Sequence, residues 1–226
     1  AHYPELPVGK KRGFTFFWHQ AEQGWKPTLH GQRAYLLVAA SPHDAIADTH
    51  WFRPDFDKHL VDLACRAGVV YLENTMPLHA TETACGMKLN VKGPEGLETL
   101  EARFVVHAWL ARQMGFRPEP HPYLPERVAI FSHFRQVARA DAWLASSQEA
   151  WPYMPDDAAV HHLLEEGWDW LLHFDNGITS LGFTLRTDRL PDQDPEACWR
   201  QLLTRYPSLQ ALLAHAQPLY PLRMLP

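Results

Sequence analysis

The chain has 226 residues, of which 46% are hydrophobic, and its formal net charge is −5. This length and composition allow a buried core in one large domain or in two closely joined ones. The basic residues are scattered and no run of about 18 apolar residues occurs, so we expect neither a nucleic-acid nor a membrane partner. Three widely spaced cysteines and the lack of a signal-peptide pattern favour a reducing compartment, and we predict a cytoplasmic protein.

The first part of the chain carries strand signals followed by one clear helix signal. β-Branched and aromatic residues predict strands at 13–18 and 34–40, joined by a polar connection that contains glycine. Apolar residues at helical spacing then predict a helix that opens at Pro54 and stops at Gly68. We expect residues 69–72 to form a strand directly after this helix.

The middle of the chain predicts a small antiparallel sheet. Residues 78–106 alternate weakly around a turn at 92–96, which indicates a β-meander closing on a buried strand at 102–106. One helical turn is expected at 110–115, and a proline-rich connection follows it. Another strand is expected at 128–134.

The segment 167–183 is the most informative local pattern. Trp168 and Trp170 stand two residues apart and therefore share one face of an extended strand. The pair Asn176-Gly177 then turns the chain back into a second strand, which predicts a β-hairpin. The tryptophan face of this hairpin must contact something large and flat, either a core or a bound aromatic ligand.

The end of the chain predicts two short helices. Residues 196–215 carry an amphipathic pattern that Pro207 divides. Together the elements indicate an α+β fold (mixed α/β) with a largely antiparallel sheet.

Several stretches, in this order along the chain, resemble FAD-dependent monooxygenases of the tryptophan-halogenase-like group. They are Arg53–Asp57 with Leu60 and Ala64, Ala102–Val106, Leu110–Gly115, Phe131–Phe134 and the hairpin Gly167–Gly182. That group carries a Gly-Trp-x-Trp-x-Ile-Pro motif and then a Gly-x-x-Ser-x-Gly strand. The chain keeps Gly167, Trp168 and Trp170, has Leu172 and His173 in place of Ile and Pro, and keeps Gly177, Ser180 and Gly182.

The resemblance implies a Rossmann-like FAD domain interleaved with an antiparallel substrate-binding sheet. On this basis residues 1–49 and 118–190 belong to the substrate-binding sheet, and residues 50–117 form a partial FAD-binding-domain region. Residues 191–226 supply the C-terminal helices. The expected fold is therefore an antiparallel substrate-binding sheet with remnants of a Rossmann-like FAD-binding domain.

The resemblance also implies FAD as cofactor, an aromatic small molecule as substrate and a flavin reductase as a candidate partner. In that group reduced FAD reacts with O2, and oxygen is transferred to an aromatic ring or to a halide. Our first hypothesis is that the chain forms part of an FAD-dependent oxidoreductase, either a monooxygenase or a halogenase-like enzyme. Because Leu172-His173 replaces Ile-Pro, we rank plain monooxygenation above halogenation. The alternatives are a non-catalytic relative that binds an aromatic ligand or protein partner through its Trp-rich sheet, and a structural module of an assembly.

Two departures from the group concern FAD. The 226 residues contain no Gly-x-Gly-x-x-Gly turn, which would seat a pyrophosphate on a helix N-terminus. Where the group has Val-Val-Asp-Ala-Ser-Gly, the chain has Val105-Val106-His107-Ala108-Trp109-Leu110, which places His107 at the position of the aspartate. These departures count against FAD binding by this chain alone. We expect activity only together with a separate nucleotide-binding part.

The resemblance and the chemistry of the residues together give a candidate site. Lys10 and Lys11 precede the first strand, near the place where halogenases have the lysine proposed to handle hypohalous acid, and Lys11 is the candidate catalytic residue. His133, on a predicted strand, could hydrogen-bond a phenol or act as a general base. The candidate substrate-binding residues are Phe16, Trp18, Trp168, Trp170 and Ser180, and the candidate cofactor-binding residues are Arg53, Asp57 and His107.

Each of these candidates has a plain structural alternative. Lys11 could be a solvated surface lysine beside Lys10, and His133 a strand histidine bonded to the backbone. Arg53 could form an ion pair with Asp55 or Asp57, which would contribute little at the surface.

No metal site is predicted. His161 and His162 are adjacent, and adjacent side chains diverge on a helix or a strand, so they cannot jointly hold one ion. The other histidine–aspartate pairs lack a third ligand at a recognisable spacing.

Overall fold

The computed structural model describes residues 5–106, 125–145 and 150–225. It contains two compact units, one formed by Ala1–Phe56 with Pro125–Pro226 and the other by Asp57–Leu124. We call them unit 1 and unit 2. None of the described helices is long and apolar enough to cross a membrane.

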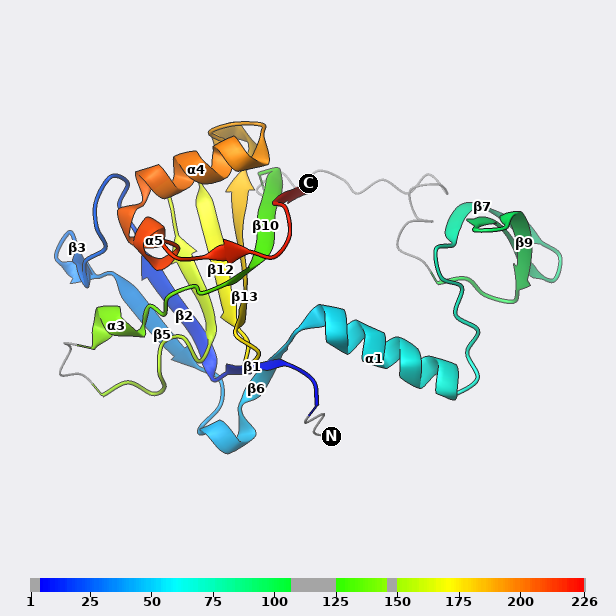
Figure 1. The fold of residues 1–226 in the computed structure, drawn as a ribbon, viewed down its shortest axis with the longest axis horizontal. Helices are drawn as coiled ribbons and strands as arrows, with labels where there is room; N and C mark the ends of the chain where they lie inside the picture. The colour runs from blue at the N-terminus through cyan, green and yellow to red at the C-terminus, as the bar shows by residue number, and fades with distance from the viewer. Residues whose placement is uncertain (1–4, 107–124, 146–149, 226) are drawn as a thin grey trace. The chain divides into compact units, whose positions relative to one another are not determined.

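Unit 1 is built on an eight-stranded sheet (Figure 1). Its strands are β2 (Gly13–Trp18), β5 (Tyr35–Ala39), β10 (Arg127–Arg135), β11 (Ala159–Leu163), β12 (Gly167–His173), β13 (Ile178–Arg186), β14 (Gln217–Pro218) and β15 (Arg223–Leu225). They lie in the order β14-β10-β13-β12-β11-β2-β5, and β15 also pairs with β10. Among the described strands β11 and β2 are parallel neighbours, while every other pair is antiparallel. The predicted mixed fold with a largely antiparallel sheet is confirmed.

The predicted β-hairpin is formed by β12 and β13. Gly177 in its turn has φ +75°, a conformation that glycine adopts without a steric cost. The Asn176 side chain supports the turn, because its Oδ1 accepts a hydrogen bond of 3.1 Å from the backbone N–H of Ile178. The register places Trp170 opposite Gly182.

Among the described residues, the helices that lie wholly in unit 1 are α3 (Asp141–Leu144), α4 (Pro195–Arg205) and α5 (Pro207–Leu212). Asp194 caps α4 by accepting from the N–H of Ala197, and Pro207 opens α5 at a position where no N–H is needed, so the predicted division is confirmed. Figure 1 shows α4 and α5 against one face of the large sheet. Their apolar side chains form the main core with strand residues such as Phe17, Leu171 and Phe183.

Shorter elements complete unit 1. They are β1 (Val8–Lys11), which pairs with β6 (Asp48–Trp51), β3 (Thr28–Leu29), which pairs with β4 (Gln32–Arg33), and the 3-10 turns η1 (Asp44–Ile46) and η2 (Thr187–Arg189). The β1–β6 pair matters for the site because it carries Lys11.

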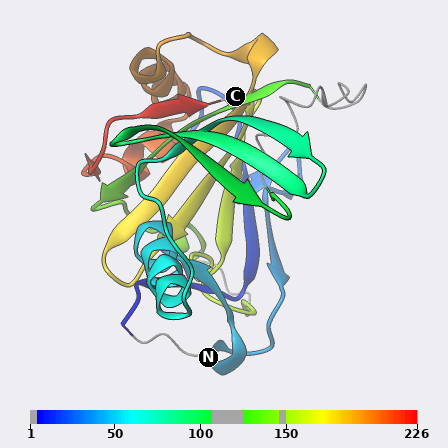
Figure 2. The same ribbon diagram turned by 90° about the vertical axis from the view of Figure 1, so that its right-hand side faces the viewer.

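The helix α1 (Arg53–Arg66) begins in unit 1 and continues into unit 2. It ends close to Gly68, whose φ is +91°, as predicted from the sequence. Unit 2 also contains the meander of β7 (Met76–Thr83), β8 (Gly86–Gly93) and β9 (Gly96–Ala102), which is seen in Figure 2. The predicted meander and its turn at 92–96 are confirmed.

Two predicted strands in unit 2 are wrong. Residues 69–72 form no strand, and Val70 is 81% exposed. The last strand of the meander ends at Ala102, so residues 102–106 are not a buried strand, and Val106 is 99% exposed. β-Branched residues favour a strand only where a neighbouring strand pairs with them, and these segments have none among the described residues. The predicted helical turn at 110–115 lies outside the described residues.

Candidate functional site

The face of the large sheet opposite α4 and α5 carries most of the predicted site residues. Side chains alternate between the two faces of a strand, so β2 buries Thr15 and Phe17 in the core and turns its other rings outward. Phe14 and Trp18 are 37% and 38% exposed. The outward rings form a surface that we call the aromatic strip: Phe14, Phe16 and Trp18 of β2, His161 of β11, Trp168 and Trp170 of β12, and Phe131 of β10.

The rings of the aromatic strip contact one another across the strands. Between ring centroids, His161 lies 4.9 Å from Trp168 and 5.4 Å from Phe16. Trp168 and Trp170 are 6.3 Å apart, and Trp170 is 6.0 Å from Phe131. Aromatic pairs at such distances stabilise each other. The strip is therefore one continuous, partly exposed apolar surface that spans the middle of the sheet.

The orientation of Trp170 depends on two residues of β13. Its Nε1 donates a hydrogen bond of 3.1 Å to the Oγ of Ser180. Its ring lies over Gly182, where a Cβ atom would come within 2.4 Å of the indole. The spacing Ser-x-Gly thus supplies an acceptor and an empty space on the same face. Ser180, a predicted substrate-binding residue, holds a tryptophan of the strip.

Lys11 lies at one end of the aromatic strip. Its Nζ is 3.0 Å from Asp48 Oδ2 and 5.0 Å from the centroid of the Phe14 ring. The neighbouring Lys10 instead bridges two aspartates, Asp44 and Asp157, which raise the pKa of its ammonium. Successive residues of a strand point to opposite sides, so only one of the two lysines reaches the strip.

His133 lies at the other end, in a cavity of about 240 Å³. The residues that line the cavity are Pro54, Phe131, Ser132, His133, Tyr220, Pro221 and Arg223. Phe131 belongs both to this cavity and to the aromatic strip, so the two are continuous. Burial lowers the pKa of His133, which keeps its imidazole neutral and able to accept a proton at neutral pH.

Of the three predicted cofactor-binding residues, two lie in the described part of the chain. Arg53 and Asp57 both lie near the N-terminal end of α1, and both already take part in an interaction. His107 lies outside the described residues. The role of these three residues in cofactor binding stays a prediction.

Comparison with known proteins links this geometry to one group of enzymes. No family model matches the chain. Tetracycline 7-halogenase of Kitasatospora aureofaciens is 29% identical over 224 residues, and monodechloroaminopyrrolnitrin halogenase PrnC of Pseudomonas fluorescens is 24% identical over 229. The alignments cover 92% and 96% of this chain but 39% of either relative.

Solved structures show the same fold. Halogenase PltM superimposes with a TM-score of 0.81 at 23% identity, covering 97% of this chain and 44% of its own. CmlS, a flavin-dependent halogenase, superimposes with a TM-score of 0.68 at 20% identity, covering 96% of this chain and 38% of its own. The chain is similar to flavin-dependent halogenases and matches about 40% of their length. The preference for plain monooxygenation over halogenation is therefore not supported by the relatives found.

Sequence reasoning did not assign places to the two adjacent histidines. His161 belongs to the aromatic strip, while His162 points into the core. There its Nδ1 lies 2.9 Å from His19 Nε2, and its backbone N–H donates to Asp169 Oδ1 at 2.8 Å. Burial lowers the pKa of both core histidines, that of His19 to about 4, and raises the pKa of Asp169. The two side chains diverge, as expected from the sequence, and the signal that could have assigned one of them to the outward face is the alternation of the strand they share.

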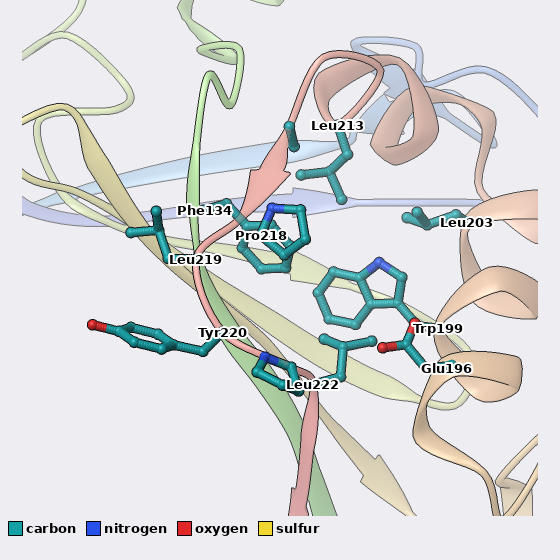
Figure 3. A pocket seen from close by; sticks show the side chains of 11 residues that line it. Phe134, Glu196, Trp199, Leu203, Leu213, Pro218, Leu219, Tyr220 and Leu222 are labelled. Carbon is teal, nitrogen blue, oxygen red and sulfur yellow. The ribbon is translucent and has the colours of Figure 1, made fainter.

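A second cavity lies on the helix-covered side of the sheet. It measures about 470 Å³ and is lined mainly by apolar side chains of α4 and of residues 213–222. Figure 3 shows Trp199 and Phe134 facing into it, with ring centroids 5.4 Å apart. None of the predicted site residues lines this cavity.

Within the described part of the chain, no group of three or more His, Cys, Asp or Glu side chains could hold a metal ion. On the outward face of the large sheet, the groups that could bind an organic ligand are the rings of the aromatic strip, the Lys11 ammonium and the His133 imidazole.

Proposed function

We propose that this chain supplies the aromatic-substrate-binding part of an FAD-dependent, halogenase-like oxidoreductase. The observation that carries the proposal is the aromatic strip, a partly exposed surface with Lys11 at one end and the His133 cavity at the other. A soluble fold normally buries most of its large rings in the core, so a row of them on an outward face suggests a ligand or a partner.

The residues present suit one part of FAD and not another. The aromatic strip offers a flat apolar surface that fits a planar ring system. The sequence has no glycine-rich turn before a helix to hold a pyrophosphate, so the nucleotide half of FAD would need residues outside this chain. When bound by such a complete protein and reduced by an external reductant, FAD would supply the electrons that activate O2.

The chain's own residues would position the substrate. Trp168 and Trp170 provide faces on which an aromatic ring can stack. The Lys11 ammonium, close to the Phe14 ring, can donate a hydrogen bond to an oxygen atom at that end of the strip. The neutral His133 imidazole can accept a proton at the other end.

The relatives support both the cofactor and the class of substrate. One structure of halogenase PltM contains phloroglucinol and FAD. The two curated relatives are halogenases of tetracycline and of monodechloroaminopyrrolnitrin. Because the chain spans 39% of the length of those relatives, halogenation of an aromatic small molecule is proposed here for the whole protein.

A binding experiment tests the site. Phloroglucinol is titrated into the purified chain, and tryptophan fluorescence is followed. We expect saturable quenching in the wild type. In Trp168→Leu the affinity should fall about fivefold or more, since stacking of a planar ring on an aromatic side chain contributes about 1–3 kcal/mol to binding. The matched control is Trp143→Phe, because the partly buried Trp143 ring packs against the core and is not part of the strip, and this variant should bind like the wild type. Absence of quenching in the wild type would contradict the proposal.

A turnover experiment separates the enzyme from the non-catalytic alternative. A protein that joins the chain to a separate nucleotide-binding part is incubated in air with FAD, an NADH-fed flavin reductase, chloride or bromide, and phloroglucinol, and the products are analysed by mass spectrometry. A halogenated product supports the proposed oxidoreductase. Phloroglucinol binding without product and without bound flavin supports a non-catalytic relative that uses the strip only to hold a ligand.

A further inference from the structure

His161 lies at the centre of the aromatic strip. It stands on β11, between the rings of Phe16 on β2 and Trp168 on β12. It is the polar member of a surface otherwise made of phenylalanine and tryptophan side chains. A ligand that covers the strip would therefore meet the His161 imidazole near its own centre.

One hydrogen bond determines which nitrogen of His161 is available. Nδ1 lies 3.2 Å from the backbone oxygen of Asp169. A carbonyl oxygen can only accept, so Nδ1 carries the hydrogen and Nε2 keeps its lone pair. No described hydrogen bond involves Nε2, and it is not among the buried side-chain nitrogen and oxygen atoms that lack a partner, so it keeps access to a ligand. Burial also lowers the pKa of the ring, which stays neutral near pH 7.

We infer that His161 Nε2 accepts a hydrogen bond from a hydroxyl or N–H group of an aromatic ligand lying on the strip. The inference rests on the proposed function and narrows its substrate class to aromatic compounds that carry a donor, such as phenols. Such a contact would also favour substitution of the ring, because an oxygen whose proton is held by a base donates more electron density to the ring.

His161 is better prepared for this contact than His133. The Asp169 carbonyl fixes both the tautomer and the orientation of the His161 ring. The His133 ring has edge contacts with Phe52 and Tyr220 at 5.5 and 6.2 Å, and no described hydrogen bond selects its tautomer. A fixed acceptor loses less freedom when it binds a donor.

Phenol and anisole provide the test, because they differ in the donor and little in shape. Both are titrated into the purified chain, with tryptophan fluorescence as readout. We expect the wild type to bind phenol about fivefold more tightly than anisole, as one net hydrogen bond allows. In His161→Asn the side-chain amide can still donate to Asp169 while the Nε2 acceptor is lost, so the preference should disappear. In the matched control, the exposed His43→Asn, the preference should persist. His133→Asn tests the competing acceptor at the end of the strip.

The outcomes separate the inference from the proposed function. If neither compound binds the wild type, the proposed aromatic site is wrong, and the inference with it. If both bind equally well, the site stands and the role of His161 is wrong. A preference that survives in His161→Asn but is lost in His133→Asn would assign the acceptor to His133.

A second measurement needs no variant and therefore does not depend on a mutant folding. Long-range 1H–15N NMR spectra of the 15N-labelled wild type report the tautomer of each histidine. We expect the Nδ1–H form for His161, and a 15N shift of its Nε2 on addition of phenol but not of anisole. An Nε2–H form, or equal shifts with both compounds, would overturn the inference.

Discussion

Trp170 Nε1 donates a hydrogen bond of 3.1 Å to Ser180 Oγ across the β12–β13 hairpin. The same indole covers Gly182, two residues further along β13, where no side chain would fit. An acceptor and a vacant position therefore hold one large ring on the outward face of the sheet. This gives a physical reason for a Trp-x-Trp strand followed by a Ser-x-Gly strand, since the second strand orients a ring of the first.

Removing the acceptor should loosen Trp170. Ser180→Ala leaves the partly buried indole N–H without its partner, and we expect a loss of about 1 kcal/mol in the free energy of unfolding. Urea unfolding measures this loss, and the tryptophan emission should shift to the red. Ser180→Thr keeps the hydroxyl and is the control. Equal stability of the alanine variant and the wild type would show that the hydrogen bond contributes nothing.

Filling the vacant position should be more harmful. In Gly182→Ala the new Cβ would lie 2.4 Å from the Trp170 ring and 2.5 Å from Phe131 Cβ, so both side chains must move. Overpacking of this kind costs about 1–3 kcal/mol. Gly24→Ala is the control, because its nearest neighbour there is Ser208 Oγ at 3.9 Å. Thermal or urea unfolding should show a large loss for the first variant and little change for the second.

The two adjacent lysines offer a matched pair for the proposed activity. Lys11→Met removes the ammonium beside the aromatic strip and should abolish halogenated product in the reconstituted assay. Lys10→Met removes the ammonium that bridges Asp44 and Asp157 and should retain product formation, with a modest loss of stability. Similar product yields from both variants would remove Lys11 from the catalytic assignment.

The buried histidines should make the fold sensitive to acid. His19 is neutral in the folded protein, since burial lowers its pKa from 6.5 to about 4. Below pH 6.5 unfolding takes up a proton at His19, so stability is fully present above about pH 6.5 and falls as the pH drops towards 4. Between pH 6.5 and 5 this loss is on the order of 2 kcal/mol.

A variant isolates this effect from that of other titrating groups. In His19→Gln the part of the pH dependence of the unfolding free energy that is due to His19 should be lost. The difference in unfolding free energy between wild type and variant should therefore change with pH. Urea unfolding at pH 7 and pH 5 measures that difference. The exposed His43→Gln is the matched control. A constant difference between wild type and His19→Gln at both pH values would contradict the prediction.

Local sequence patterns were sufficient where a residue's neighbours lie close in the chain. The hairpin needs only Asn176-Gly177 and two alternating runs, and the two C-terminal helices need only an apolar period and Pro207. Prediction failed at residues 69–72 and 102–106, because a strand also needs a pairing partner and local composition cannot supply one.

The sequence by itself determined that Trp168 and Trp170 share a face, because side chains alternate along a strand. Tertiary structure decided what lies beside them. The parallel pairing of β11 with β2 brings Phe16 next to His161, although the two are far apart in the chain. It also decided that Lys11, and not Lys10, reaches the strip. Such contacts depend on strand order and register, which arise from packing of the whole sheet and not from any local run of residues.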